Sequence, residues 1–152
     1  MGKYGSSEDP VEKCFRKHES QLSYTRARRC DQLDVEGTDF LLDFKIKSKK
    51  SDERFFFPLS MRLQVKMSDN GETIGLVLPL QSPPPDKIKD RISERMLEII
   101  ADHARKHPHV SCILFVAQLE KAKSEKQILS DIWREMRRML GFIRRHHFPR
   151  FG

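Results

Sequence analysis

The 152-residue chain is 38% hydrophobic and 34% charged, with a formal net charge of +7, which suits one domain with a single hydrophobic core. Its longest apolar run, residues 113–117, is too short to span a bilayer, and its polar first residues lack the apolar region of a secretory signal. The three cysteines form no CxxC pair, which argues against a disulfide framework or a cysteine zinc site and favours a reducing, cytoplasmic setting.

The N-terminal part of the chain is expected to contain a leader, a helix and a short strand. Residues 1–9 are predicted to be disordered, ahead of a single domain over residues 10–152. Pro10 suits the first turn of a helix, and apolar side chains near helical spacing extend that helix to about Ser23. The stripe consists of Val11, Cys14, Phe15, His18 and Leu22. Residues 23–29 are compatible with a short strand.

From Thr38 the hydrophobic period changes to two, which predicts β-strands. The side chains that point to one face of the first of these strands are Phe40, Leu42, Phe44 and Ile46. A second strand follows in residues 55–67, where Pro58 indicates a bulge or an edge position. Asn70-Gly71 is a strong hairpin signal, so residues 72–80 are predicted to return as a third, antiparallel strand.

The C-terminal half is predicted to alternate helix, strand and helix. A helix runs from Asp86 to Lys106, and its buried stripe is Ile88, Ile92, Met96, Ile99, Ile100 and His103. Residues 110–118 are nearly all apolar, as in a strand covered on both faces. Ser124 and Gln127 form a capping box for a last helix over residues 124–147. Helices interleaved with one central sheet predict an α/β sandwich.

Positive charge is concentrated at the C-terminal end. Residues 121–152 hold nine Lys and Arg against three acidic residues, a net +6 of the total +7. Such a basic segment favours attraction to a polyanion, although a solvated helix face gives the same composition. The candidate phosphate contacts face away from the apolar stripe of the last helix and are Arg134, Arg137, Arg138, Arg144 and Arg145.

Two neighbouring predicted strands carry residues that suit metal-assisted phosphodiester cleavage. Asp39 lies at the start of the first strand, and Gln64 and Lys66 lie two residues apart, hence on one face of the second. Carboxylate and amide oxygens can hold Mg²⁺, or Mn²⁺ in its place, which lowers the pKa of a bound water. Lys66 would stabilise developing charge. Because Gln64 brings no charge, we expect Glu12 or Glu19 of the first helix to complete the metal shell.

This pattern resembles the PD-(D/E)xK, or restriction-endonuclease-like, nuclease superfamily. The matching residues are Gly37-Thr38-Asp39-Phe40 for the acidic strand start and Gln64-Val65-Lys66 for the second motif, in a QxK variant. The resemblance covers roughly residues 11–118 and implies an α-β-β-β-α-β core with a mixed central sheet flanked by helices, to which the basic C-terminal helix is an addition. No proline precedes Asp39, and Gln64 stands where the family's second acid is found.

The first functional hypothesis is therefore an Mg²⁺- or Mn²⁺-dependent endonuclease whose expected substrate is DNA, while the sequence itself does not distinguish DNA from RNA. Many nucleases of this type act as dimers, so the resemblance also allows a homodimer. The alternative is a catalytically inactive, nuclease-like module that binds nucleic acid or protein. A third hypothesis is an interaction protein for a polyanion other than nucleic acid.

Two further patterns give weaker candidates. Asp43-Phe44-Lys45 is a competing DxK motif, but Asp39 then lies too close upstream on the same strand. Histidines gather near one helix end and near the C-terminus, namely His103, His107, His109, His146 and His147. No carboxylate or cysteine joins them at zinc-ligand spacing, so packing of His103 in its helix is the better interpretation.

Overall fold

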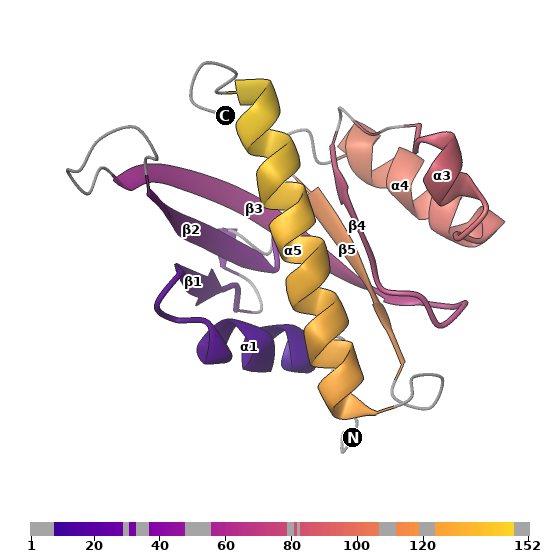
Figure 1. Cartoon of the computed structure of the whole chain (residues 1–152). Helices are drawn as coiled ribbons and strands as arrows, with labels where there is room; N and C mark the ends of the chain where they lie inside the picture. The colour runs from indigo at the N-terminus through magenta and orange to yellow at the C-terminus, as the bar shows by residue number, and fades with distance from the viewer. Residues whose placement is uncertain are drawn as a thin grey trace.

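A mixed, open, five-stranded sheet flanked by helices forms the centre of the protein (Figure 1). The computed structural model describes residues 8–28, 31–32, 37–47, 56–78, 81, 83–106, 112–118 and 124–147. The elements are α1 (Glu8–Lys17), β1 (Leu22–Arg26), β2 (Phe40–Lys47), β3 (Phe56–Ser68), β4 (Ile74–Val77), α3 (Asp86–Lys89), α4 (Glu94–Lys106), β5 (Cys112–Ala117) and α5 (Glu125–His147). The predicted α/β class is confirmed.

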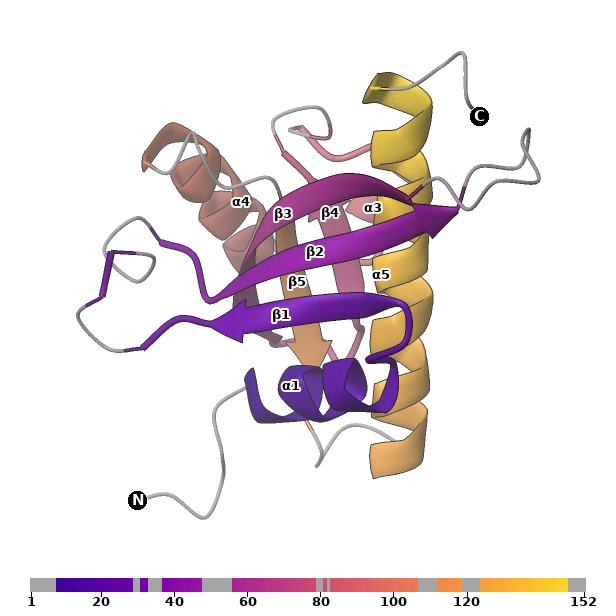
Figure 2. The same ribbon diagram turned by 90° about the vertical axis from the view of Figure 1, so that its left-hand side faces the viewer.

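The strands lie in the order β1-β2-β3-β5-β4 (Figure 2). Neighbouring strands are antiparallel except β3 and β5, which run parallel with Leu63 opposite Cys112. The prediction that β3 and β4 pair as a hairpin is wrong. The Asn70-Gly71 turn does form, with Gly71 at a φ of 80°, but β5 lies between the two strands. All six residues of β5 are buried, so this strand takes an inner position where both faces are covered.

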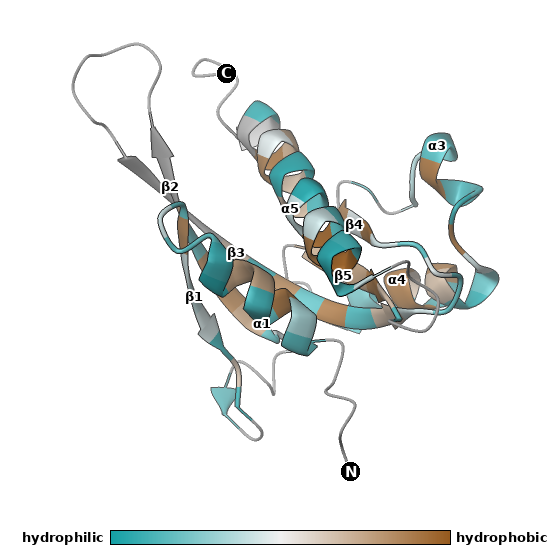
Figure 3. Ribbon diagram, turned by 60° about the horizontal axis from the view of Figure 1, so that its bottom comes forward, coloured by the Kyte–Doolittle hydropathy of each residue, from teal (hydrophilic) through white to brown (hydrophobic). Residues whose placement is uncertain are grey.

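Each face of the sheet has its own apolar core. On one face α1 and α5 pack on side chains such as Phe40, Leu63 and Leu114. On the other, α3 and α4 pack on β4 and β5, through Ile113 and Phe115 among others. Both α1 and α5 show hydrophobic and hydrophilic sides, as their predicted stripes require (Figure 3). Alternation along the strands therefore decides on which face each side chain of β3 lies.

The long helix α5 approaches β4 closely at Gly75. A Cβ at this position would lie 2.6 Å from the sulfur of Met139, so the contact requires glycine. Glu135, which is 5% exposed, accepts the Gly75 backbone N–H at 3.0 Å. Arg138 pairs with Glu135 at 2.9 Å and donates a hydrogen bond to the Gly75 carbonyl. Side chains of α5 thus satisfy both backbone groups of an edge-strand residue, which protects that edge from pairing with another strand.

Two predicted helix boundaries are wrong. The first helix ends at Lys17, not near Ser23, and Leu22 is a buried residue of β1. Residues 8 and 9, assigned to the disordered leader, belong to α1, and residues 1–7 lie outside the described residues. The helix predicted from Asp86 to Lys106 is two helices, because Ser93 caps a new start: its hydroxyl accepts the Met96 N–H at 3.1 Å.

Other sequence predictions are confirmed. Pro58 lies in the part of β3 that pairs, among the described strands, with β2 alone, since pairing with β5 begins at Leu63. A proline therefore costs no ladder hydrogen bond on the β5 side. Ser124 caps α5 by accepting the Gln127 N–H at 3.1 Å, whereas the Gln127 amide bonds Asp131 instead of completing the box. Among the helices that the structure describes, none has the length and apolarity needed to cross a bilayer.

Candidate functional site

Asp39 lies where β1, β2 and β3 meet, and three hydrogen bonds fix it there. Its backbone N–H donates to the Leu63 carbonyl at 2.9 Å, and its carbonyl accepts the Ala27 N–H at 2.8 Å. Its carboxylate Oδ2 accepts the Val65 N–H at 2.7 Å. The Asp39 carboxylate thus accepts a backbone hydrogen bond just beyond the paired end of β2. It therefore lies against the backbone of β3 between Gln64 and Lys66.

Gln64 and Lys66 point away from the α1–α5 core. Their neighbours Leu63 and Val65 are buried in that core, so alternation places both polar side chains on the opposite face. Gln64 lies beside Ile113 of β5 and is 9% exposed, whereas Lys66 lies beside Phe115 and is partly exposed. The expectation that these two residues share a face is therefore confirmed by the observed strand. The structure also brings the Asp39 carboxylate to the same stretch of β3.

The face that carries Gln64 and Lys66 is apolar over β4 and β5, whereas the described side chains of β1, β2 and β3 on this face are polar apart from Leu41. The helices α3 and α4 form a core only with β4 and β5, among the described residues. On β1, β2 and β3, the described side chains that alternation places on this face are partly or fully exposed. They are Ser23, Thr25, Leu41, Asp43 and Arg62. Asp39, Gln64 and Lys66 thus border a polar half-sheet whose described side chains are accessible to solvent.

Thr38 adds a second polar group next to Asp39. Its side chain is 0% exposed, and its hydroxyl oxygen has no hydrogen-bond partner within the described part of the chain. A buried hydroxyl normally finds a partner, since leaving it unsatisfied costs free energy. This unsatisfied oxygen belongs to the residue directly before the candidate catalytic acid.

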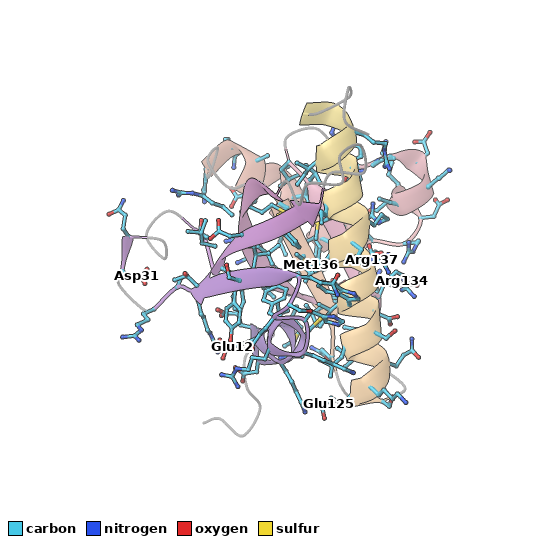
Figure 4. The ribbon with its side chains drawn as sticks, turned by 60° about the vertical axis from the view of Figure 1, so that its left-hand side comes forward. Glu12, Asp31, Glu125, Arg134, Met136 and Arg137 are labelled. Atoms are coloured by element: carbon cyan, nitrogen blue, oxygen red, sulfur yellow. The ribbon has the colours of Figure 1, made fainter. Side chains whose placement is uncertain are left out.

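The two helix glutamates are not brought to this site. Glu12 lies on α1, on the other face of the sheet, and its carboxylate pairs with Arg16 at 2.7 Å and Arg26 at 3.6 Å (Figure 4). Arg26 in turn lies over the Phe40 ring, 6.0 Å from the ring centre. Glu19 is an exposed residue of the turn after α1. The expectation that a glutamate of the first helix joins Asp39 thus finds no support in this arrangement.

The donor set around Asp39 consists of oxygen atoms. Mg²⁺ prefers oxygen ligands and commonly binds through one or two carboxylates while keeping several waters, so Asp39 and Gln64 fit it in type. They supply a single negative charge. Across the described ranges, no group of three or more His, Cys, Asp or Glu side chains is arranged to hold a metal ion. The residues present therefore match Mg²⁺ in the type of donor atom only.

The arginines of α5 lie on the face of the sheet opposite Gln64 and Lys66. Arg134 pairs with Asp131 at 3.1 Å, and Arg138 is held by Glu135 and Gly75. Arg137 and Arg145 are exposed, and the Arg144 side chain lies outside what the structure describes. Figure 4 shows Arg134 and Arg137 extending from neighbouring turns. The basic helix therefore does not border the Asp39 site, and Arg138 has a structural role that its charge alone does not reveal.

Cys14, Cys112 and the described histidines do not provide a catalytic nucleophile or a metal site. Burial raises the pKa of Cys14 to about 11, and burial also raises the pKa of Cys112, so both are neutral thiols near pH 7. His103 is buried in α4, as predicted. His107 and His109, and the side chains of His146 and His147, lie outside the described residues. Asp43 lies on β2 opposite Ser60, and the Lys45 side chain is not described, so the competing DxK motif stays a prediction.

Two features of α5 were not predicted from the sequence. Glu135 is buried, although a carboxylate inside the stripe between Ile132 and Met136 could have signalled a structural pair. The indole of Trp133 stacks on the His18 ring of the α1 end, with ring centres 3.7 Å apart and planes 2° from parallel. Nothing local in the sequence predicts this contact between residues more than one hundred positions apart.

No family model, curated protein or solved structure matches this chain.

Proposed function

We propose that this protein is a metal-dependent endonuclease of the PD-(D/E)xK type that hydrolyses phosphodiester bonds, with DNA as its substrate. The observation that carries the proposal is the hydrogen bond from the Val65 N–H to the Asp39 carboxylate. It unites the two sequence motifs, an acid at a strand start and QxK on the next strand, in one place. The residues of both motifs are the types that metal-assisted hydrolysis requires.

Each residue has a distinct role in this proposal. Asp39 and Gln64 would hold the metal through their oxygens, and the Val65 N–H keeps the Asp39 carboxylate in position. When bound, Mg²⁺ would lower the pKa of a water and shield the charge of the phosphate. The Lys66 ammonium would orient that water or stabilise the charge that develops on the scissile oxygen. The polar half-sheet beside them would receive the nucleic-acid backbone.

The order of elements also supports the proposal. Leaving aside β4 and α3, the chain runs α1-β1-β2-β3-α4-β5, which agrees with the α-β-β-β-α-β order that the family resemblance implies. Buried, free Cys14 and Cys112 agree with a reducing cytoplasm. A homodimer would place two such sites so that both strands of a duplex are cut.

A specific observation favours a second candidate function. Gln64 brings no charge, and neither Glu12 nor Glu19 replaces the missing acid. A nuclease-like fold with this weakened donor set could serve as a binding module for nucleic acid or protein without hydrolysing it.

Cleavage of supercoiled plasmid in Mg²⁺ or Mn²⁺ separates the two candidates. The endonuclease should nick the plasmid, and Asp39→Asn and Lys66→Ala should each lose at least about tenfold in rate, as expected for a missing charge-stabilising group. Lys89→Ala, on the surface of α3, is the matched control and should cut normally. Salt-dependent plasmid binding without nicking would establish the binding module instead.

A further inference from the structure

The cations on the α1–α5 surface differ in whether a carboxylate neutralises them. Lys13 pairs with Glu125, Arg16 with Glu12, Arg134 with Asp131 and Arg138 with Glu135. Lys17 and Arg137 are exposed, and neither forms an ion pair with another described residue. Lys126 and Arg145 of α5 are likewise exposed without an ion pair to a described residue, but Lys17 and Arg137 are the two cations whose charges act on His18.

Lys17 and Arg137 flank the same aromatic stack. His18 follows Lys17 directly and stacks on Trp133, which lies one helical turn before Arg137 on α5. Burial lowers the pKa of His18, and the charges of Lys17 and Arg137 lower it further. The positive charges of Lys17 and Arg137 therefore both act on the His18 imidazole. Glu19 is the acidic residue next to His18 in the sequence, and its charge acts on Arg16.

A structural role alone does not account for both cations. Lys17 is in the last turn of α1, where a positive charge interacts favourably with the helix dipole. Arg137 is in the interior of α5, far from either helix end, so the dipole gives no reason for its position. Two exposed cations from different helices, without ion pairs inside the described ranges and beside a partly exposed aromatic pair, are the groups that contact a phosphate backbone.

We propose that Lys17, His18, Trp133 and Arg137 form a binding site for the phosphate backbone of single-stranded nucleic acid, and that protonation of His18 strengthens it. The site lies on the face of the sheet opposite Asp39 and Lys66, so it does not depend on hydrolysis there. A bound phosphate would neutralise the three converging cations and thereby stabilise the charged imidazole.

Trp133 is the only tryptophan of the chain, so its fluorescence reports on this site alone. The imidazolium should quench its emission, with a midpoint below the ordinary histidine value of 6.5. Addition of a short oligothymidylate, in EDTA to prevent hydrolysis, should move that midpoint upward. An unchanged midpoint at saturating oligonucleotide would overturn the proposal, as would a shift produced by heparin and not by the oligonucleotide.

The salt dependence of binding tests the individual cations. Each lost phosphate contact should reduce the slope of log affinity against log salt by roughly 0.7 for a single strand. Lys17→Gln and Arg137→Gln should each show that reduction, whereas Arg134→Gln, already paired with Asp131, is the matched control and should not. Equal slopes in all three variants and the parent protein would overturn the assignment. Urea unfolding confirms that each variant is folded.

The pH dependence of binding tests His18. His18→Phe keeps an aromatic ring against Trp133 but cannot take a proton. The parent protein should bind more tightly as the pH falls through the titration of His18, and the variant should lose most of this gain. The same pH dependence in both proteins would show that His18 does not contribute.

Discussion

The Asp39 carboxylate accepts a hydrogen bond from the Val65 backbone N–H, with 2.7 Å between Oδ2 and the nitrogen. This contact gives Asp39 a structural function in addition to the proposed metal-binding one. It satisfies a donor of β3 just beyond the end of its pairing with β2, which stops at Phe40. A loss of activity in an Asp39 variant is therefore informative only when the stability of that variant is known.

Asparagine and alanine at position 39 separate these two functions. Asp39→Asn keeps an oxygen acceptor for the Val65 N–H, so the free energy of unfolding should fall by less than about 1 kcal/mol. Asp39→Ala leaves a partly buried N–H without its partner and should cost about 1–3 kcal/mol. Urea unfolding measures both. If both variants were equally stable, the hydrogen bond would not contribute to the free energy of unfolding. If Asp39→Asn cut plasmid normally, the charge would have no catalytic role.

Gly75 should be intolerant of a side chain because α5 lies against it. Gly75→Ala places a Cβ 2.6 Å from the Met139 sulfur, and Met139 is 0% exposed, so its side chain has little room to move. We expect a loss of about 1–3 kcal/mol in the free energy of unfolding. In the double variant Gly75→Ala/Met139→Ala the added methyl group occupies released space, so the two losses should not add. Additive losses would contradict the proposed contact.

Arg137 and Arg138 are adjacent in the sequence, but substitution should destabilise the protein at Arg138 and hardly at all at Arg137. Arg138→Gln removes the cation beside the Glu135 carboxylate, which is 5% exposed, and a donor to the Gly75 carbonyl. Because Arg138 itself is 37% exposed, we expect a loss of about 1–3 kcal/mol, less than for a fully buried pair. Arg137→Gln should change stability by less than about 0.5 kcal/mol. Chemical unfolding of the two variants provides the comparison, and similar losses would refute it.

The same pair of arginines shows what sequence patterns can and cannot predict. Helical periodicity correctly gave the apolar stripe of α5, because burial of one helix face depends on local spacing. Arg138 pairs with Glu135 three residues earlier on α5, but the hydrogen bonds of both side chains to Gly75 depend on which strand lies beneath the helix. Gly75 and Glu135 are sixty residues apart, so the sequence could not distinguish an arginine held in place from one open to solvent.

The strands show the same difference between local and long-range determinants of structure. A period of two located β2 and β3 and placed Gln64 and Lys66 on one face, because alternation is a local property of extended chains. The hairpin prediction failed because local turn chemistry at Asn70-Gly71 does not determine which strand pairs with β3. That choice depends on β5, which is apolar on both faces and fills the inner position. Glu12 of α1 was misplaced for a similar reason, since no local pattern says which face of the sheet a helix covers.

The stability of the protein should depend on the protonation of His18. Burial and the charges of Lys17 and Arg137 hold the pKa of His18 below the value of 6.5 that it would have in the unfolded chain. As the pH falls below 6.5, the unfolded state binds more protons than the folded state, so the free energy of unfolding decreases. The decrease ends once the pH lies below the folded-state pKa. His18→Phe lacks this contribution.

The check is the difference in urea midpoint between the parent protein and His18→Phe as a function of pH. This difference should be constant above about pH 7.5, where histidine is neutral in both states. It should shift in favour of the variant as the solution is acidified. A shift in the opposite direction would mean that the folded protein stabilises the charged imidazole, contrary to the surroundings of His18.

Gln64→Glu restores the second acid of the family motif and should reveal whether the site binds metal. Gln64 is 9% exposed and lies beside Ile113, so a carboxylate there should destabilise the metal-free protein by burying a charge near Asp39. Mg²⁺ would offset that cost, because binding only to the folded state raises stability. The thermal midpoint of the variant should therefore be below that of the parent protein in EDTA and rise more steeply with Mg²⁺. Gln21→Glu makes the same change of charge at an exposed position and is the matched control. An equal Mg²⁺ response in both variants would indicate nonspecific ion binding and count against a metal site at Asp39.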